Sequence, residues 1–190
     1  MRTCSEDIRE DKLAEMARQD NPVAMKTLYN RYVRYLTAIC SRYIDNEDDV
    51  RDVLQDAFLK IFSSIDKFTY LGEGSLKSWL AKVTVNETLK FIKRNGRLDF
   101  VSLEKENIDI EDDEPELDNI PISEIHNMIR ELKPGYRTIF NLYVFEEKSH
   151  KEIASILNIK ESTSASQLHR AKAILADKIR KYQTLTPYAR

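Results

Sequence analysis

The sequence predicts an all-α protein, with two small helical domains joined by a flexible acidic linker. Only four glycines occur among 190 residues and 33% of the residues are charged, a composition that disfavours a sheet-rich protein. Apolar residues make up 42% of the chain and recur in long stretches at steps of three and four, the period of an amphipathic helix. Residues 95–121 break that period, so we expect a domain boundary there. Residues 99–124 carry 11 acidic side chains against one lysine.

The first predicted helix begins at Asn21 and Pro22, an N-cap residue followed by proline at the first helical position. Its apolar stripe continues to Tyr43. After a turn at 45–47, a second helix runs to Phe62 with an apolar inward face. Its outward face is largely acidic and consists of Asp49, Asp52, Asp56 and Lys60.

An irregular stretch containing Gly72 and Gly74 precedes a third predicted helix. Its apolar positions are Leu76, Trp79, Leu80 and Val83. Lys82, Asn86, Lys90 and Lys93 follow one another at steps of four, four and three, which places them on one polar, mainly basic ridge. The helical phase of Phe68 and Trp79 predicts core packing rather than base stacking for both rings.

The second domain follows an acidic segment that contains two prolines and whose roughly 25 residues could extend to ~80 Å. A helix is expected from Ile122 to Leu132. The sequence Lys133-Pro134-Gly135 ends it, and a further helix resumes at Tyr136 and continues to Val144. These two helices are expected to support the element that follows them.

Residues 149–175 have the pattern of a helix-turn-helix. Ser149 and Glu152 form an S-x-x-E capping box at a helix start. Asn158 suits the sharp turn, because Asn tolerates the left-handed conformation. Ser162 is the expected N-cap of the second helix. The buried face of that helix is predicted to comprise Ala165, Leu168, Ala171 and Leu175.

The remaining residues of this second helix suit the major groove of DNA, since Gln and Arg can contact base edges while Ser, Thr and Lys hold phosphates. A basic surface helix that binds a protein is the alternative interpretation. The residues predicted to face outward are Thr163, Ser164, Ser166, Gln167, His169, Arg170 and Lys172.

Charge is unevenly distributed along the chain, although the net charge is only −2. Residues 22–94 hold 12 basic and 9 acidic side chains, or +3, and residues 160–190 hold 7 and 2, or +5. The segment 99–124 contributes −10. Two basic regions are therefore masked by an acidic one, and DNA is the expected partner.

Several classes of function are disfavoured. Cys4 and Cys40 lack the spacing of a metal or redox motif, so reduced thiols are expected. No glycine-rich phosphate loop or catalytic triad order is visible, and only three histidines occur. We therefore expect no enzyme activity, no metal and no cofactor. Without a long apolar run or a signal sequence, the expected location is the cytoplasm.

Three blocks in order resemble the bacterial RNA polymerase sigma factors of the extracytoplasmic-function (ECF) group. They are DVRDVLQDAFLKIF at 49–62, SWLAKVTVNETLKFIKR at 78–94 and LKPGYRTIFNLYVFEEKSHKEIASILNIKESTSASQLHRAKAIL at 132–175. The resemblance implies a sigma-2 domain at 10–95, a linker at 96–121 and a sigma-4 domain at 122–183. Val50-Arg51 stands where the family usually has Ala-Glu.

The resemblance also implies roles for the surfaces. The core polymerase would be bound at its beta-prime coiled coil by Asp49, Asp52, Gln55 and Asp56. The minus-10 promoter element would be melted and captured by the loop 69–75 together with Lys82, Asn86, Lys90, Lys93 and Arg94. The outward residues of the helix-turn-helix would read the minus-35 element, and the helix at 136–145 would dock on the beta flap.

The function so implied is that of a transcription initiation factor that directs core polymerase to its promoters and promotes DNA melting. The family resemblance further implies an anti-sigma protein as a partner. The alternative is a helix-turn-helix regulator that binds DNA without core polymerase.

Overall fold

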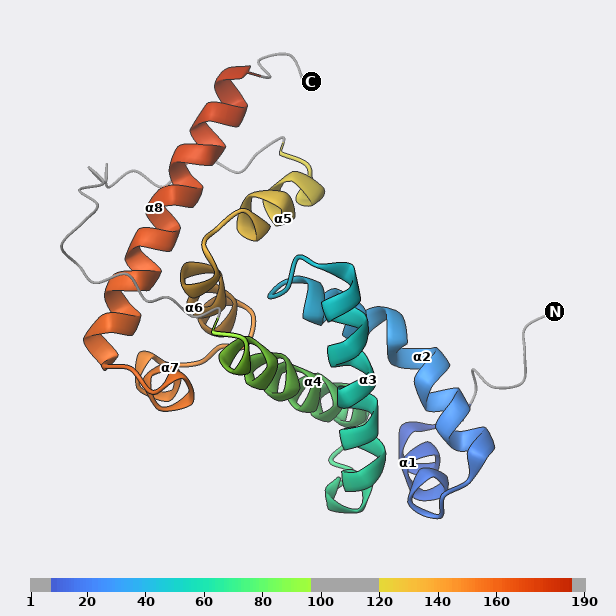
Figure 1. The fold of residues 1–190 in the computed structure, drawn as a ribbon. Coiled ribbons are helices and arrows are strands. Elements are labelled where there is room, and N and C mark those ends of the chain that lie inside the picture. The colour runs from blue at the N-terminus through green and yellow to red at the C-terminus, as the bar shows by residue number, and fades with distance from the viewer. Residues whose placement is uncertain (1–7, 97–119, 186–190) are drawn as a thin grey trace. The chain divides into compact units, whose positions relative to one another are not determined.

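The computed structural model describes residues 8–96 and 120–185. Within them the chain forms eight α-helices and one 3-10 turn and no strand, which confirms the all-α prediction. The chain separates into two compact units, Met1–Asn95 and Gly96–Arg190 (Figure 1). The predicted acidic linker lies almost wholly at 97–119, outside the described residues.

Unit 1 contains α1 (Glu10–Arg18), α2 (Pro22–Ser41), α3 (Glu47–Ser64), the turn η1 (Ile65–Lys67) and α4 (Ser75–Arg94). Helix α4 contacts the other three helices, so one face of it is enclosed by them. The largest fully buried side chains of this unit are Leu13, Leu28, Leu36, Ile39, Ile61, Leu76, Leu80 and Ile92.

Side chains of asparagine start two of these helices. Asn21 Oδ1 accepts hydrogen bonds from the amides of Val23 (2.9 Å) and Ala24 (3.2 Å), ahead of Pro22 at the first helical position. Asn46 does the same for Asp48 and Asp49. Each cap satisfies amides that have no partner inside the helix. The start predicted at Asn21 is thus confirmed.

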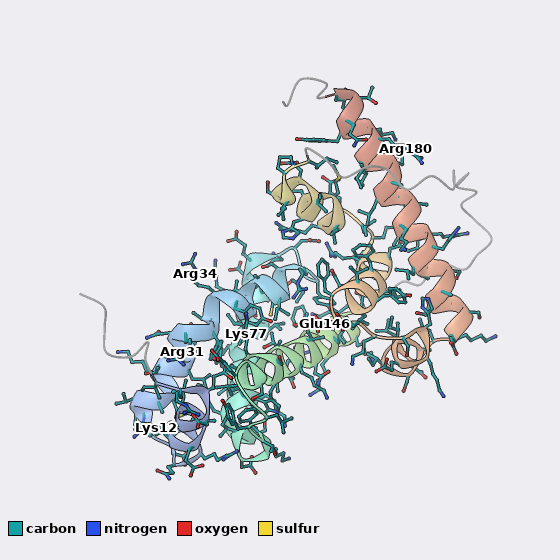
Figure 2. All side chains as sticks on the ribbon, turned by 180° about the vertical axis from the view of Figure 1, so that it is seen from behind. Lys12, Arg31, Arg34, Lys77, Glu146 and Arg180 are labelled. Atoms are coloured by element: carbon teal, nitrogen blue, oxygen red, sulfur yellow. The ribbon has the colours of Figure 1, made fainter. Side chains whose placement is uncertain are left out.

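Helix α1 was not predicted by the apolar pattern. It buries only Leu13, Ala14 and Ala17, and polar contacts add to this small apolar face. The Tyr32 hydroxyl of α2 donates to Glu10 Oε1 at 2.9 Å. Arg31, labelled on α2 in Figure 2, donates to the Ile8 carbonyl at 2.8 Å. These bonds fasten the start of the described chain to α2.

Unit 2 contains α5 (Ile122–Arg130), α6 (Pro134–Val144), α7 (His150–Leu157) and α8 (Glu161–Leu185). Helix α6 starts at Pro134, two residues before the predicted Tyr136, because proline is itself favourable at the first helical position. The 25-residue α8 contacts α5, α6 and α7 (Figure 1). One core cluster comprises Ile120, Met128, Ile129, Leu132, Tyr136, Ala171, Leu175 and Ile179.

Tyr32 should give unit 1 a measurable alkaline stability transition. Burial, followed by the hydrogen bond to Glu10, raises the pKa of Tyr32 to about 12. The stability conferred by the neutral hydroxyl is complete below the ordinary pKa of ~10 and is lost as pH rises towards 12. The wild type should therefore lose about 2 kcal/mol more unfolding free energy between pH 9 and 12 than Tyr32→Phe.

Urea unfolding followed by Trp79 fluorescence measures this difference, because the sequence contains one tryptophan and it lies in unit 1. The lysines that titrate in the same range are shared by both proteins and cancel in the comparison. Equal losses in the two proteins would show that the Tyr32 hydroxyl does not contribute in this way.

Candidate nucleic-acid interface

The helix-turn-helix of unit 2 starts with a complete capping box. Glu152 N donates to Ser149 Oγ (3.3 Å), and Ser149 N donates to Glu152 Oε2 (2.8 Å). Hydrogen bonds from the Ser149 amide and hydroxyl hold the pKa of Glu152 below its ordinary value. Helix α7 ends at Leu157, and its C-cap residue Asn158 has a left-handed φ of 57°. Both sequence predictions are confirmed.

The second helix of the motif begins earlier than predicted. Helix α8 starts at Glu161, and its first turn is closed by the Ser164 amide on the Lys160 carbonyl (3.1 Å). Ser162 therefore lies inside the first turn and is exposed, so its prediction as N-cap was wrong. The reason is the tight turn before it, in which the Ile159 amide donates to the Ala154 carbonyl (3.0 Å).

Ser164 and Gln167 do not face outward as predicted. They are only 0% and 1% exposed. The Ser164 hydroxyl lies 3.0 Å from His150 Nδ1, and the His150 ring stacks on Tyr143 with centroids 4.9 Å apart. Ser164 thus joins α8 to the start of α7, and we remove both residues from the interface.

Ser164 replaces Ala165 as the first residue of the buried face of α8. The buried face passes through Ser164, Leu168, Ala171 and Leu175, at steps of four, three and four, whereas Ala165 is exposed. The prediction of a buried Ala165 was therefore wrong. A hydrogen-bonded serine, rather than an alanine, occupies that position of the core.

The outward stripe of α8 consists of Ser162, Ala165, His169 and Lys172, which are all exposed and follow at steps of three, four and three. Thr163, Ser166 and Arg170 flank it and are half-buried. Ser162 and Ala165 were missed by the sequence reasoning. Their spacing from His169 and Lys172 was the available signal, but the apparent apolar repeat through Ala165 outweighed it.

The basic ridge predicted in unit 1 lies on the exposed side of α4. Lys82, Asn86, Lys90, Lys93 and Arg94 are all exposed. Lys90 pairs with Glu87 at 2.7 Å, and the Arg94 guanidinium lies 5.8 Å from the centre of the Phe91 ring. The ridge thus presents mainly positive charge along three turns of one helix.

The opposite side of α4 is buried and includes two threonines. The hydroxyls of Thr84 and Thr88 donate to carbonyls one turn back, at 2.9 and 2.8 Å. These bonds satisfy the buried hydroxyls. Trp79 packs on the buried Phe68, with ring centroids 5.6 Å apart, which confirms the predicted core role of that pair.

The acidic surface of α3 is formed as predicted. Asp52, Gln55 and Asp56 are exposed and Asp49 is half-buried. Arg51, which interrupts the acidic run, pairs with Asp48 at 2.8 Å and Glu47 at 3.8 Å on its own helix. The positive charge of Arg51 is thereby drawn towards the start of α3, and residues 52–56 remain acidic.

A small apolar surface marks the end of α6. Tyr143, Val144 and Phe145 are all exposed, and the Phe145 ring contacts Phe140 edge-on with centroids 6.3 Å apart. Adjacent exposed apolar side chains of this kind favour a protein contact.

Within residues 8–96 and 120–185, no group of three or more His, Cys, Asp or Glu side chains could hold a metal ion. The same residues include no helix with the length and apolarity needed to cross a membrane. Cys40 is buried as a free thiol, and burial raises its pKa.

Two helical units, one with a helix-turn-helix and one with a basic helical ridge, are features of a DNA-binding protein. Two family sequence models match the chain: Sigma-70 region 2 at residues 28–98, and Sigma-70, region 4 at residues 122–175. The chain belongs to the sigma-70 family of RNA polymerase sigma factors, in its ECF group. It is a promoter-specific transcription initiation factor.

Curated relatives with the same family description align with nearly the whole length of this chain. The ECF RNA polymerase sigma-E factor of Haemophilus influenzae is 28% identical over 191 residues, covering 92% of this chain and 97% of its own. The factor of the same description from Escherichia coli K12 is 28% identical over 189 residues, with 92% and 96% coverage. A solved structure, CnrH in complex with the cytosolic domain of CnrY, is 23% identical with a TM-score of 0.47, covering 89% and 96%.

The Ser164–His150 contact should contribute to the stability of unit 2. Ser164→Ala leaves the His150 nitrogen without this partner and should cost about 1 kcal/mol of unfolding free energy. Ser166→Ala, on the same helix and half-buried, should change stability by less than about 0.5 kcal/mol.

Thermal unfolding measured by far-UV circular dichroism reports on both units, whereas Trp79 fluorescence reports on unit 1. Ser164→Ala should lower the midpoint temperature of the unit 2 transition followed by circular dichroism. The midpoint of the transition followed by Trp79 fluorescence should be unchanged. Identical dichroism curves for Ser164→Ala and Ser166→Ala would refute the assigned role.

Proposed function

We propose that the outward stripe of α8 enters the major groove of the minus-35 element. The proposal rests on the exposure of one side of α8, which consists of Ser162, Ala165, His169 and Lys172. The other side of α8 packs against α7. Thr163, Ser166 and Arg170 would contact the flanking phosphates. A helix-turn-helix docks its second helix in this way, with its N-terminal residues nearest the bases.

In unit 1, the minus-10 element would be held by the ridge of α4 and the loop 69–75. Lys82, Lys90, Lys93 and Arg94 would hold phosphates of the unpaired strand, and Asn86 would offer a polar contact to a base. Extruding a base costs a few kcal/mol. Backbone and polar groups of the loop that hold the extruded base would recover that cost.

Core polymerase would be bound through Asp49, Asp52, Gln55 and Asp56 on α3, opposite the basic coiled coil of the beta-prime subunit. Charge complementarity of this kind sets orientation and association rate. The apolar surface of Tyr143, Val144 and Phe145 would dock on the beta flap. The exposure of both surfaces supports these assignments.

The two units would act as separate domains at 10–95 and 122–183, with 96–121 as the linker that lets them reach two promoter elements. The factor would work in the cytoplasm and catalyse no reaction itself. An anti-sigma protein would hold it inactive by covering the surfaces that bind polymerase.

The proposal as a whole is tested by transcription in vitro. The purified chain added to core polymerase should direct initiation from its promoter. A chain that binds this promoter yet neither associates with core polymerase nor supports transcription would instead be a regulator acting alone.

Lys172→Ala should reduce the salt dependence of binding to double-stranded minus-35 DNA. Loss of one phosphate contact lowers the slope of log K against log salt by about one. Lys181→Ala is the matched control, because Lys181 lies on the same helix but pairs with Asp177 at 2.7 Å. Fluorescence anisotropy over a salt series provides the slopes. Equal slopes for the wild type and Lys172→Ala would remove Lys172 from the interface.

Asp52→Lys should weaken binding to core polymerase by about tenfold or more, because it reverses one charge of a complementary pair. Binding to double-stranded minus-35 DNA should be unchanged. Asp177→Lys makes the same change of charge in unit 2 and serves as the control. Competition of each variant with the wild type for limiting core polymerase measures the effect, and an unaltered titration for Asp52→Lys would refute the docking surface.

A further inference from the structure

Helix α1 contacts both ends of the connection between α3 and α4. It lies at 10–18, outside the stretch 28–98 that matches the region 2 model. The connection is the loop that we assign to capture of the minus-10 element. Each end of α1 contributes one charged side chain to it, Glu10 at the start and Arg18 at the finish.

Glu10 caps α4 from outside that helix. Its Oε2 accepts hydrogen bonds from the amides of Gly74 (2.9 Å) and Leu76 (3.2 Å), while its Oε1 accepts from the Tyr32 hydroxyl (2.9 Å). Gly74 has a φ of 84° and no side chain to act as the cap. A carboxylate is favoured at a helix N-terminus, where free amides and the helix dipole are both positive. Glu10 therefore holds the end of the loop that leads into α4.

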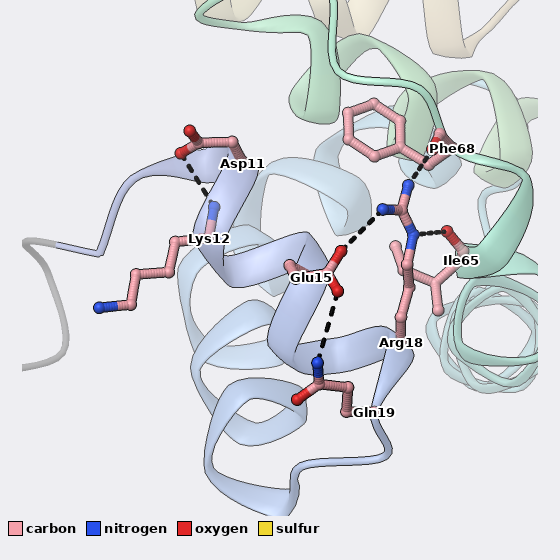
Figure 3. Close-up of polar contacts among 7 residues, drawn as sticks. All are labelled: Asp11, Lys12, Glu15, Arg18, Gln19, Ile65 and Phe68. Atoms are coloured by element: carbon pink, nitrogen blue, oxygen red, sulfur yellow. Dashed lines mark hydrogen bonds and ion pairs between the residues drawn. The ribbon is translucent and has the colours of Figure 1, made fainter.

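Arg18 holds the other end. Its Nε donates to the Ile65 carbonyl at 3.3 Å, and its Nη2 donates to the Phe68 carbonyl (Figure 3). Glu15 on the same helix accepts from Nη1 at 3.0 Å and keeps the guanidinium in place (Figure 3). Because Phe68 is also buried against Trp79, the chain leaves the core at a fixed point.

Between these two anchors the loop turns sharply and presents its side chains to solvent. The Ser75 hydroxyl donates to the Gly72 carbonyl at 2.6 Å and accepts from the Leu71 amide at 3.3 Å. Thr69, Tyr70 and Glu73 are exposed, and Leu71 is 85% exposed. Tyr70 and Leu71 thus stand on a short loop that is fixed at both ends but packs into no core.

We propose that α1 is a positioning element for promoter recognition. Glu10 and Arg18 hold the loop 69–73 in the shape that receives an unpaired minus-10 base, and neither residue touches DNA. The proposal rests on the role assigned to this loop under the proposed function. A loop ordered before binding loses less conformational freedom on binding, and small displacements of its contacts weaken discrimination between bases.

The test uses Glu10→Gln in holoenzyme with core polymerase. The amide keeps the size of the side chain but exchanges one acceptor oxygen for a donor, so it cannot accept all three hydrogen bonds. Asp11→Asn is the matched control, since it makes the same change on the next residue. Asp11 contacts Arg9 and accepts from the Lys12 amide (Figure 3).

The readout is binding to a non-template strand carrying the minus-10 element, compared with strands substituted at each of its positions. At the position that the wild type discriminates most, Glu10→Gln should lower the ratio of affinities about tenfold, the scale of one lost hydrogen bond to a charged group. Asp11→Asn should keep the wild-type ratio. Affinity for core polymerase and for double-stranded minus-35 DNA should be unchanged in both variants, which separates positioning from a general loss of fold.

Amide hydrogen exchange supplies a second measurement on the same variants. Exchange at Gly74 and Leu76 should accelerate in Glu10→Gln and not in Asp11→Asn. Arg18→Lys, which cannot donate to both carbonyls with the geometry of a guanidinium, should lower the discrimination ratio as well and serves if Glu10→Gln does not fold.

Failure of the minus-10 role of the loop and failure of the positioning role of α1 give different results in this experiment. A wild-type holoenzyme that shows no preference at any minus-10 position would overturn the proposed role of the loop, and this inference with it. A wild type that discriminates, with Glu10→Gln and Arg18→Lys discriminating equally well, would overturn the positioning role of α1 alone.

Discussion

The structure depends on one long helix in each unit that faces two ways. Helices α4 and α8 each pack against every other helix of their own unit and leave their remaining side charged or polar. Each of these two helices therefore completes the core of its unit and, under the proposed function, presents its other side to DNA. A substitution on the buried side displaces the exposed side with it, because the helix is rigid.

This arrangement explains why polar residues are buried on both helices. Thr84 and Thr88 on α4 satisfy their hydroxyls within their own helix, so they pack without losing hydrogen bonds. Ser164 on α8 finds its partner on another helix, at His150. That bond joins the buried side of α8 to the start of α7.

The sequence indicates those features whose causes are local. The Asn21 cap, the capping box of Ser149 and Glu152, and the left-handed Asn158 depend on residues within a few positions of one another, and all were predictable. The start of α8 was missed because of a local turn at residues 154–159, whereas the other features that were missed depend on distant partners. Glu10 contacts amides 64 and 66 residues away, and Ser164 contacts a histidine 14 residues away. Apolar periodicity carries no trace of such bonds, so α1 was overlooked and Ala165 was assigned to the buried face of α8 in place of Ser164.

Lysine footprinting of the holoenzyme, before and after promoter is added, tests most directly whether the exposed sides of α4 and α8 face promoter DNA. Acetylation read by mass spectrometry reports on every lysine in one experiment. Lys82, Lys90, Lys93 and Lys172 should lose reactivity when promoter binds, while Lys12 and Lys181 should keep theirs. Unchanged reactivity of the first four lysines, or equal protection of Lys181 and Lys172, would show that these sides of α4 and α8 do not face promoter DNA.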